Sequence, residues 1–174
     1  MTPSRLQAFS LLELLVTLTV AGTLLSIAVP SFSAYLEQNR QTAHVNQMLG
    51  AINYARATAI TAGTTVSLCA GDGVCDNSRR WQDQILIFTD ANRNGQLDGS
   101  DTLLRINALA SDYSWDWSNF RRQKHMSFKS DGTTLSLNGT FTLCQHAQDA
   151  RRVVINLSGR ARSDKPTDEA RCTP

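Results

Sequence analysis

Residues 8–36 read AFSLLELLVTLTVAGTLLSIAVPSFSAYL, an apolar run whose only charged residue is Glu13. A helix needs about 20 apolar residues to cross a hydrocarbon core of about 30 Å. The run is therefore long enough for one crossing. A secretory signal would have a shorter apolar core, with a small-residue cleavage site after it. The sequence predicts a membrane-spanning helix in this part of the chain.

Glu13 is the unusual residue of this run. A charged side chain in a membrane helix is unfavourable, by roughly 2.5 kcal/mol or more at the centre of the bilayer. Two interpretations are open. Glu13 either lies at the membrane surface, where its carboxylate reaches water, or is neutralised by a positively charged partner.

The string Ala8-Phe9-Ser10-Leu11-Leu12-Glu13, followed by the apolar run with Pro30, resembles the class III signal and N-terminal helix of type IV pilins and type II secretion pseudopilins. The resemblance implies that a prepilin peptidase removes residues 1–8, cutting between Ala8 and Phe9, and methylates the amine of Phe9. It also implies that Glu13 neutralises the N-terminus of a neighbouring subunit during assembly. Residues 9–36 would then form the transmembrane half-helix that packs in the filament core. The family usually has Gly where this chain has Ala8, which is also small.

Apolar residues continue beyond the membrane run at steps of three and four, with Gly63 as a stop signal. This spacing places them on one face of a helix. The pattern predicts an amphipathic half-helix over residues 37–62 that packs under a globular domain. The residues that define its apolar face are Val45, Met48, Leu49, Ile52, Ala55 and Ala59.

Residues 63–174 change to short β-branched and apolar runs separated by turn residues. Such runs are typical of buried strands. We expect one or two antiparallel sheets wrapped on the second half of the helix, which gives an α+β, type IV pilin-like fold. The predicted strands are residues 64–69, 84–89, 103–106, 126–129, 135–137, 140–144 and 152–157.

The four cysteines, Cys69, Cys75, Cys144 and Cys172, all follow the apolar run, as in a domain delivered to an oxidising compartment. Four cysteines permit three pairings, and we favour Cys69–Cys75, which closes a short loop, and Cys144–Cys172, which fixes the C-terminal segment. Zinc binding by Cys144, His146 and Cys172 is the alternative. The paired Cys-x-x-Cys spacing of structural zinc sites is missing.

Four arginines fall within twelve residues near the end of the chain: Arg151, Arg152, Arg160 and Arg162. Gly159 between them predicts a turn that presents the last two. Arginines on a hairpin can bind several phosphates through charge-assisted hydrogen bonds, with a salt-sensitive and largely sequence-independent affinity. The alternative is a solvated basic tail over residues 151–174, in which neighbouring acids form weak ion pairs.

Residues 151–162, RRVVINLSGRAR, resemble the FimT/GspH group of minor pilins. The Gly159-Arg160-Ala161-Arg162 string is similar to the Gly-Arg-x-Arg motif of FimT-type minor pilins that bind DNA during natural transformation. The resemblance implies that Arg160 and Arg162 contact the phosphate backbone of double-stranded DNA, with Arg151, Arg152 and Gly159 in the same interface. It implies assembly with other major and minor pilins, an inner-membrane anchor with a periplasmic domain, and display on the pilus. A GspH-like pseudopilin of type II secretion, without DNA binding, is the alternative.

A central loop, residues 90–101, nearly fits a calcium-binding loop. Alternating oxygen side chains surround Gly95, and that glycine permits the sharp turn. The loop has Asp101 where the bidentate Glu belongs, and strand-like rather than helical flanks. A surface turn rich in Asn, Asp and Gly is the alternative. The candidate ligands are Asp90, Asn92, Asn94, Asp98 and Asp101.

A second basic group, Arg121, Arg122 and Lys124, follows an aromatic stretch that ends at Phe120. This group either extends a binding face or packs a loop. Net charge does not choose between partners, because 17 Lys and Arg residues nearly balance 15 Asp and Glu residues. The histidines are scattered, and the sequence has neither a nucleophile elbow nor a phosphate-binding glycine loop. We therefore expect a structural and binding protein rather than an enzyme, with no cofactor apart from the possible calcium ion.

Overall fold

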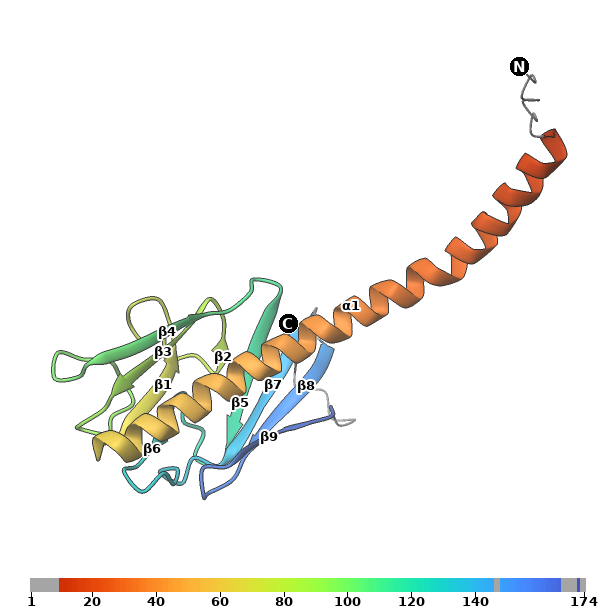
Figure 1. Cartoon of the computed structure of the whole chain (residues 1–174). Coiled ribbons are helices and arrows are strands. Elements are labelled where there is room, and N and C mark those ends of the chain that lie inside the picture. The colour runs from red at the N-terminus through yellow and green to blue at the C-terminus, as the bar shows by residue number, and fades with distance from the viewer. Residues whose placement is uncertain (1–9, 146–147, 167–171, 173–174) are drawn as a thin grey trace, which may run out of the picture. The chain divides into compact units, whose positions relative to one another are not determined.

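The structure, a computed structural model, describes residues 10–145, 148–166 and 172 (Figure 1). It has one long helix, α1 (Leu11–Ala62), and nine strands within these residues. The chain divides into two compact units, Met1–Arg40 and Gln41–Pro174. The first unit carries the N-terminal part of α1, and the second carries the rest of α1 and both sheets.

The first unit contains the predicted membrane span, because α1 includes a window with a mean hydropathy of 2.0, apolar and long enough to cross a membrane. Ser10 caps the helix by accepting a hydrogen bond of 3.2 Å from the backbone N–H of Glu13. The helix continues through Pro30 without interruption. Hydroxyls along it donate to carbonyl oxygens one turn earlier, such as Thr23 to Val20 at 2.8 Å and Ser26 to Thr23 at 2.7 Å. These bonds satisfy polar groups that lipid cannot.

In the second unit, the remainder of α1 packs through the apolar face that the sequence predicts. Ala51 also belongs to this face, whereas Leu49 is only partly buried. The helix ends at Ala62, and Gly63 follows with φ of 64°. A left-handed glycine is the common way to end a helix. The buried residues of α1 are Val45, Met48, Ala51, Ile52, Ala55 and Ala59.

Two antiparallel sheets complete this unit, and the part of α1 from Gln41 to Ala62 runs alongside them in Figure 1. The first sheet has the order β4-β3-β1-β6 and the second has the order β2-β5-β7-β8-β9. The first consists of β1 (Val66–Ala70), β3 (Gln84–Thr89), β4 (Leu103–Ala108) and β6 (Met126–Phe128). The second consists of β2 (Arg80–Trp81), β5 (Tyr113–Asn119), β7 (Gly139–Gln145), β8 (Gln148–Ile155) and β9 (Ala161–Asp164).

The core between α1 and the second sheet is built on aromatic side chains. Trp117 stacks on Phe141 with ring centroids 4.2 Å apart, and Trp81 meets the same ring edge-on at 4.7 Å. The buried indole N–H groups are satisfied, because Trp81 donates to the carbonyl of Lys124 at 3.2 Å and Trp117 to that of His125 at 3.1 Å. Both acceptors lie in the segment between β5 and β6, so the core also fixes that segment.

Two disulfides tie the domain: Cys69–Cys75 and Cys144–Cys172. These are the pairings that the sequence favours. Cys144 and Cys172 are therefore not free thiolates for zinc, and His146 lies outside the described residues. The second bond fastens Cys172 to Cys144 on β7, and the Cys172 N–H donates to Asp149 on the neighbouring strand β8 at 2.9 Å.

The strand predictions need four corrections. Residues 135–137 form no strand, and an isolated bridge between Phe128 and Thr134 stands nearby. The aromatic stretch from Tyr113 is strand β5, which was not among the predicted strands. The turn predicted at Gly159 is present, and the residues after it form strand β9, which was not predicted. Strand β2 was also not predicted.

Candidate functional site

The turn between β8 and β9 is organised by Asn156. Its side-chain oxygen accepts hydrogen bonds from the Ser158 hydroxyl at 2.7 Å and from the Arg160 N–H at 2.9 Å. Its backbone carbonyl accepts from Gly159 at 3.0 Å, and its own N–H donates to Arg160 at 3.2 Å. The turn is therefore closed by its own polar groups, and the chain enters β9 directly after Arg160.

Gly159 packs closely against residues outside this turn. It is buried, with φ of 77°, and a Cβ built on it would lie 2.2 Å from the Gly132 carbonyl oxygen and 3.0 Å from Arg56 Nε. Arg56, on α1, donates through Nε to Gly132 at 2.9 Å and through Nη2 to Ser158 at 3.2 Å. Sequence reasoning missed Gly132 and Arg56, because their contacts with the turn join distant parts of the chain. Gly159 is therefore buried, whereas the next residue, Arg160, is exposed.

Arg160 and Arg162 are both exposed. Arg162 lies opposite Val154 on the edge strand β9. Val153, the neighbour of Val154, faces the core, so Arg162 projects from the opposite face of the sheet. Among the described residues, no carboxylate lies within salt-bridge distance of either guanidinium. These two charges are available to an external anion.

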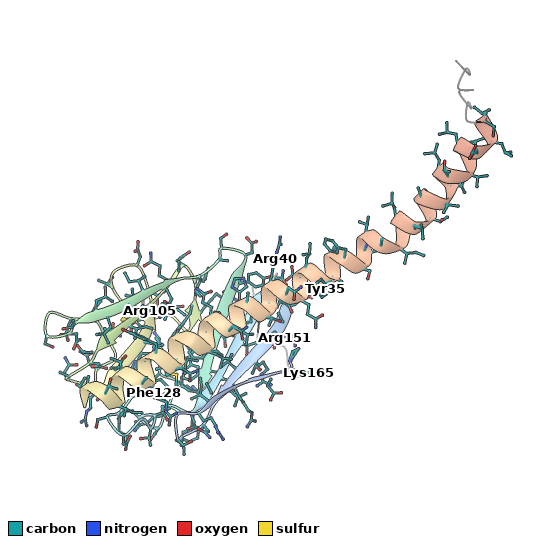
Figure 2. The ribbon with its side chains drawn as sticks, viewed as in Figure 1. Tyr35, Arg40, Arg105, Phe128, Arg151 and Lys165 are labelled. Carbon is teal, nitrogen blue, oxygen red and sulfur yellow. A yellow bond between two sulfur atoms is a disulfide. The ribbon has the colours of Figure 1, made fainter. Side chains whose placement is uncertain are left out.

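Arg151 and Arg152 lie on opposite faces of β8, because successive residues of a strand alternate. Arg152 is opposite Asp164 and diagonal to Arg162, on the face away from the core. Arg151 is on the other face and, with Lys165, lines a cavity of about 300 Å³; Figure 2 labels both residues. The four arginines therefore do not form one patch on the sheet: Arg152 and Arg162 share one face, and Arg151 lies on the other.

The loop over residues 90–101 is held by carboxylates that accept hydrogen bonds from the loop itself. Asp90 is fully buried and accepts from the Ser67 hydroxyl at 2.5 Å and from the N–H groups of Asn94 and Gly95 at 3.0 Å. Asp98 accepts from the side chain and N–H of Ser100 and from the amides of Asn92 and Asn94, and these bonds lower its pKa. The Asp101 carboxylate accepts from the backbone N–H groups of Ala91 and Asp98.

The predicted calcium ligands therefore already form hydrogen bonds within the loop. The amide groups of Asn92 and Asn94 point their N–H₂ donors at Asp98, at 2.8 and 3.0 Å, and a cation at that carboxylate would have to displace them. Within residues 10–145, 148–166 and 172, no three His, Cys, Asp or Glu side chains gather as metal ligands. Calcium binding at this loop stays a prediction, and a higher melting temperature in calcium than in chelator would support it.

His125 packs directly against this loop. A Cβ built on Gly95 would lie 2.1 Å from its Nδ1 atom, so only glycine leaves room for the imidazole. Burial lowers the pKa of His125, and the charge of Asp90 partly opposes that shift. The neutral imidazole is therefore the form that the folded domain favours.

The predicted processing site, Ala8 and Phe9, lies outside the described residues. Glu13 is exposed in the first turn of α1. It stands at the start of the apolar span, with Leu11, Leu12 and Leu14 exposed around it. An apolar surface of this kind, more than half exposed at each leucine, is typical of a segment that lipid or other subunits cover.

A long helix with an apolar N-terminal part, together with a disulfide-bonded domain of two antiparallel sheets, is a type IV pilin-like fold. Residues 44–159 match the family described as type II transport protein GspH, and the chain belongs to that family.

Solved structures agree on the fold. The chain is similar to the type IV minor pilin FimU of Pseudomonas aeruginosa (strain PAO1) in two crystal forms, both at 21% identity. One match covers 75% of this chain and 95% of the other, with a TM-score of 0.54. The second covers 78% and 96%, with a TM-score of 0.57. No curated protein matches the sequence.

Proposed function

We propose that this protein is a minor type IV pilin that is incorporated in the pilus or primes its assembly and binds extracellular DNA for natural transformation. The observation that carries the proposal is the β8–β9 turn, where Arg160 and Arg162 are exposed and have no carboxylate partner among the described residues. Gly159, Gly132 and Arg56 hold that turn in place. A fixed pair of guanidinium groups can bind phosphate without prior ordering.

The binding mechanism is electrostatic. Each phosphate that an arginine neutralises releases condensed counterions, so the logarithm of the affinity falls linearly with the logarithm of the salt concentration. Contacts to phosphate carry no sequence information. The protein would capture duplex DNA of any sequence, and retraction of the filament by motors elsewhere would bring it to the cell. No catalytic step is needed.

Assembly rests on the N-terminal segment. Prepilin peptidase would cut between Ala8 and Phe9 and methylate Phe9, and Glu13 would then neutralise the N-terminus of the adjacent pilin subunit. The exposed leucines of α1 would be covered first by the inner membrane and then by the filament core. The β-rich domain would face the periplasm and, after assembly, the cell surface.

A GspH-like minor pseudopilin of type II secretion is the second candidate, and the description of the matching family favours it. Such a subunit would contact other pseudopilins and secreted proteins rather than DNA. The two candidates share the fold and the N-terminal helix. They differ in whether Arg160 and Arg162 bind phosphate.

The decisive experiment measures duplex DNA binding by the full chain in detergent micelles, over a salt series. Arg160→Ala/Arg162→Ala should weaken binding and reduce the salt slope by about 1.8, since each phosphate contact contributes about 0.9. Arg151→Ala/Lys165→Ala is the matched control, because it removes two positive charges from the other side of the sheet. Equal effects of the two variants, or no binding by the wild type at low salt, would favour the pseudopilin.

A further inference from the structure

The segment between β5 and β6 contains a second rigid basic turn, residues 119–124. The side chain of Asn119 closes it, donating through Nδ2 to the Gln123 carbonyl at 2.7 Å and accepting from the Gln123 N–H at 3.0 Å. The Asn119 carbonyl accepts from Arg122 at 3.2 Å, and Arg122 has φ of 55°. The turn is thus defined by its own hydrogen bonds, as the β8–β9 turn is.

Phe120 stands at the tip of this turn and is 91% exposed, whereas Trp117, three residues earlier on β5, is fully buried. The aromatic stretch of the sequence therefore divides in two: its first members fill the core and its last does not. Arg121, Arg122 and Lys124 are exposed beside the ring. The Phe120 ring is therefore not part of the hydrophobic core.

This turn and the β8–β9 turn lie at the same end of the second sheet (Figure 1). One row of paired residues crosses it: Asn119 opposite Gly139, Gly139 opposite Ile155, and Ile155 opposite Ala161. Three steps between strands, each of about 4.8 Å, put the two turns roughly 14 Å apart.

The segment after β6 bridges the two turns. Arg121 donates through Nη1 to the Leu135 carbonyl at 3.4 Å, and the adjacent Thr134 N–H donates to the Leu157 carbonyl at 3.1 Å. The spacing between the turns is therefore fixed by hydrogen bonds as well as by the sheet.

We propose that the Phe120 turn is a second nucleic-acid contact, which binds unpaired bases by stacking on the Phe120 ring while Arg121 and Arg122 hold the flanking phosphates. The proposal rests on the proposed function, since it assumes that this end of the domain meets nucleic acid. Every base has a π-face, so stacking on an aromatic side chain tolerates any sequence. A duplex hides its bases, and single strands and frayed ends expose them. The Phe120 turn therefore gives the protein a preference for single-stranded segments that the arginine pair alone lacks.

An anionic lipid surface would also suit one aromatic ring and three positive charges. The position of the turn favours nucleic acid. Contacts of Gly132 with Arg56 and Ile60 place this end of the domain at the last turns of α1. From Gln41, where the chain enters the domain, α1 rises about 30 Å to Ala62. The turn thus lies at the end of the second unit remote from Gln41, the same end as the exposed Arg160.

The test compares full-length variants in micelles binding to a labelled oligothymidine of about 15 nucleotides and to a blunt duplex. Phe120→Ala should weaken binding to the single strand about 5-fold or more and change duplex binding less than about 2-fold. Phe120→Trp should retain the wild-type affinity for the single strand. Val74→Ala is the matched control, because Val74 is a 65% exposed apolar residue in a different loop. Arg121→Ala/Arg122→Ala should reduce the single-strand salt slope by about 1.4.

The proposal is overturned if Phe120→Ala binds the single strand as the Val74→Ala control does. It is also overturned if Phe120→Ala reduces binding only to vesicles of phosphatidylcholine with phosphatidylglycerol, which would identify a lipid contact. Failure of the proposed function has a different signature: Arg160→Ala/Arg162→Ala would leave duplex affinity unchanged while the effect of Phe120→Ala on the single strand persists.

Discussion

Arg56 on α1 donates a hydrogen bond of 2.9 Å to the backbone carbonyl of Gly132. The same guanidinium reaches the Ser158 carbonyl at 3.2 Å. One side chain of the helix therefore holds two turns that are far apart in the sequence. Helix packing is in this way coupled to the position of Arg160, which follows Ser158 by two residues.

Replacing Arg56 should loosen the β8–β9 turn. Arg56→Ala removes two charge-assisted hydrogen bonds from carbonyl oxygens, and we expect a loss of about 1–3 kcal/mol in the free energy of unfolding. The buried tryptophans of the second unit report unfolding by fluorescence in urea. Arg56→Lys should recover only part of the loss, because an ammonium cannot reach both carbonyls as a planar fork does. Wild-type stability in Arg56→Ala would contradict this role.

Gly159→Ala should be more damaging than an ordinary turn substitution. Its φ of 77° is unfavourable for alanine, and the new Cβ would lie 2.2 Å from the Gly132 carbonyl oxygen. We expect a loss of at least about 1 kcal/mol from the backbone conformation alone, and weaker duplex binding because Arg160 is displaced. Gly73→Ala separates the two causes, since Gly73 has φ of 69° but nothing within 4 Å of a Cβ. If both variants lose the same stability, the close approach to Gly132 has no effect.

His125 should make the domain less stable in mild acid. Burial lowers its pKa below the ordinary value of 6.5, so the unfolded chain takes up a proton at a higher pH than the folded domain does. The His125 contribution is complete above pH 6.5 and declines as the pH falls below that value. His125→Gln cannot titrate, so its melting temperature should fall less between pH 7 and 5 than that of the wild type. Parallel melting curves for the two proteins would rule out this effect.

The helix could be predicted from the sequence because its signals are local. An apolar run, a three- and four-residue spacing and Gly63 fix its type and its end, and the structure has the same end. Strand β5 also had a local signal, since Tyr113, Trp115 and Trp117 alternate with polar residues. That period of two indicates a half-buried strand, but the stretch was not among the predicted strands.

The other features of the fold and of the candidate site depend on contacts between residues far apart in the sequence, which no local pattern can show. Strand β9 is a short edge strand with mostly exposed side chains, so it has no apolar alternation, and only its pairing with β8 defines it. The sequence placed Arg151 and Arg152 in one interface, but strand alternation puts them on opposite faces. The support of Gly159 by Gly132 joins residues 27 positions apart and could not be inferred from either one.

The two disulfides should differ in their contributions to stability, because they close loops of different length. Cys144 and Cys172 are 28 residues apart, and Cys69 and Cys75 are six apart. Loop-closure entropy predicts about 3–4 kcal/mol for the longer loop and about 2 kcal/mol for the shorter one. Cys144→Ser/Cys172→Ser should therefore lower the urea midpoint more than Cys69→Ser/Cys75→Ser does. The longer bond also fastens Cys172 to the strand next to β8, so its loss should disturb β8 and β9 and weaken duplex binding. If the short-loop variant proved the less stable, packing around Cys69 rather than chain entropy would determine the ranking.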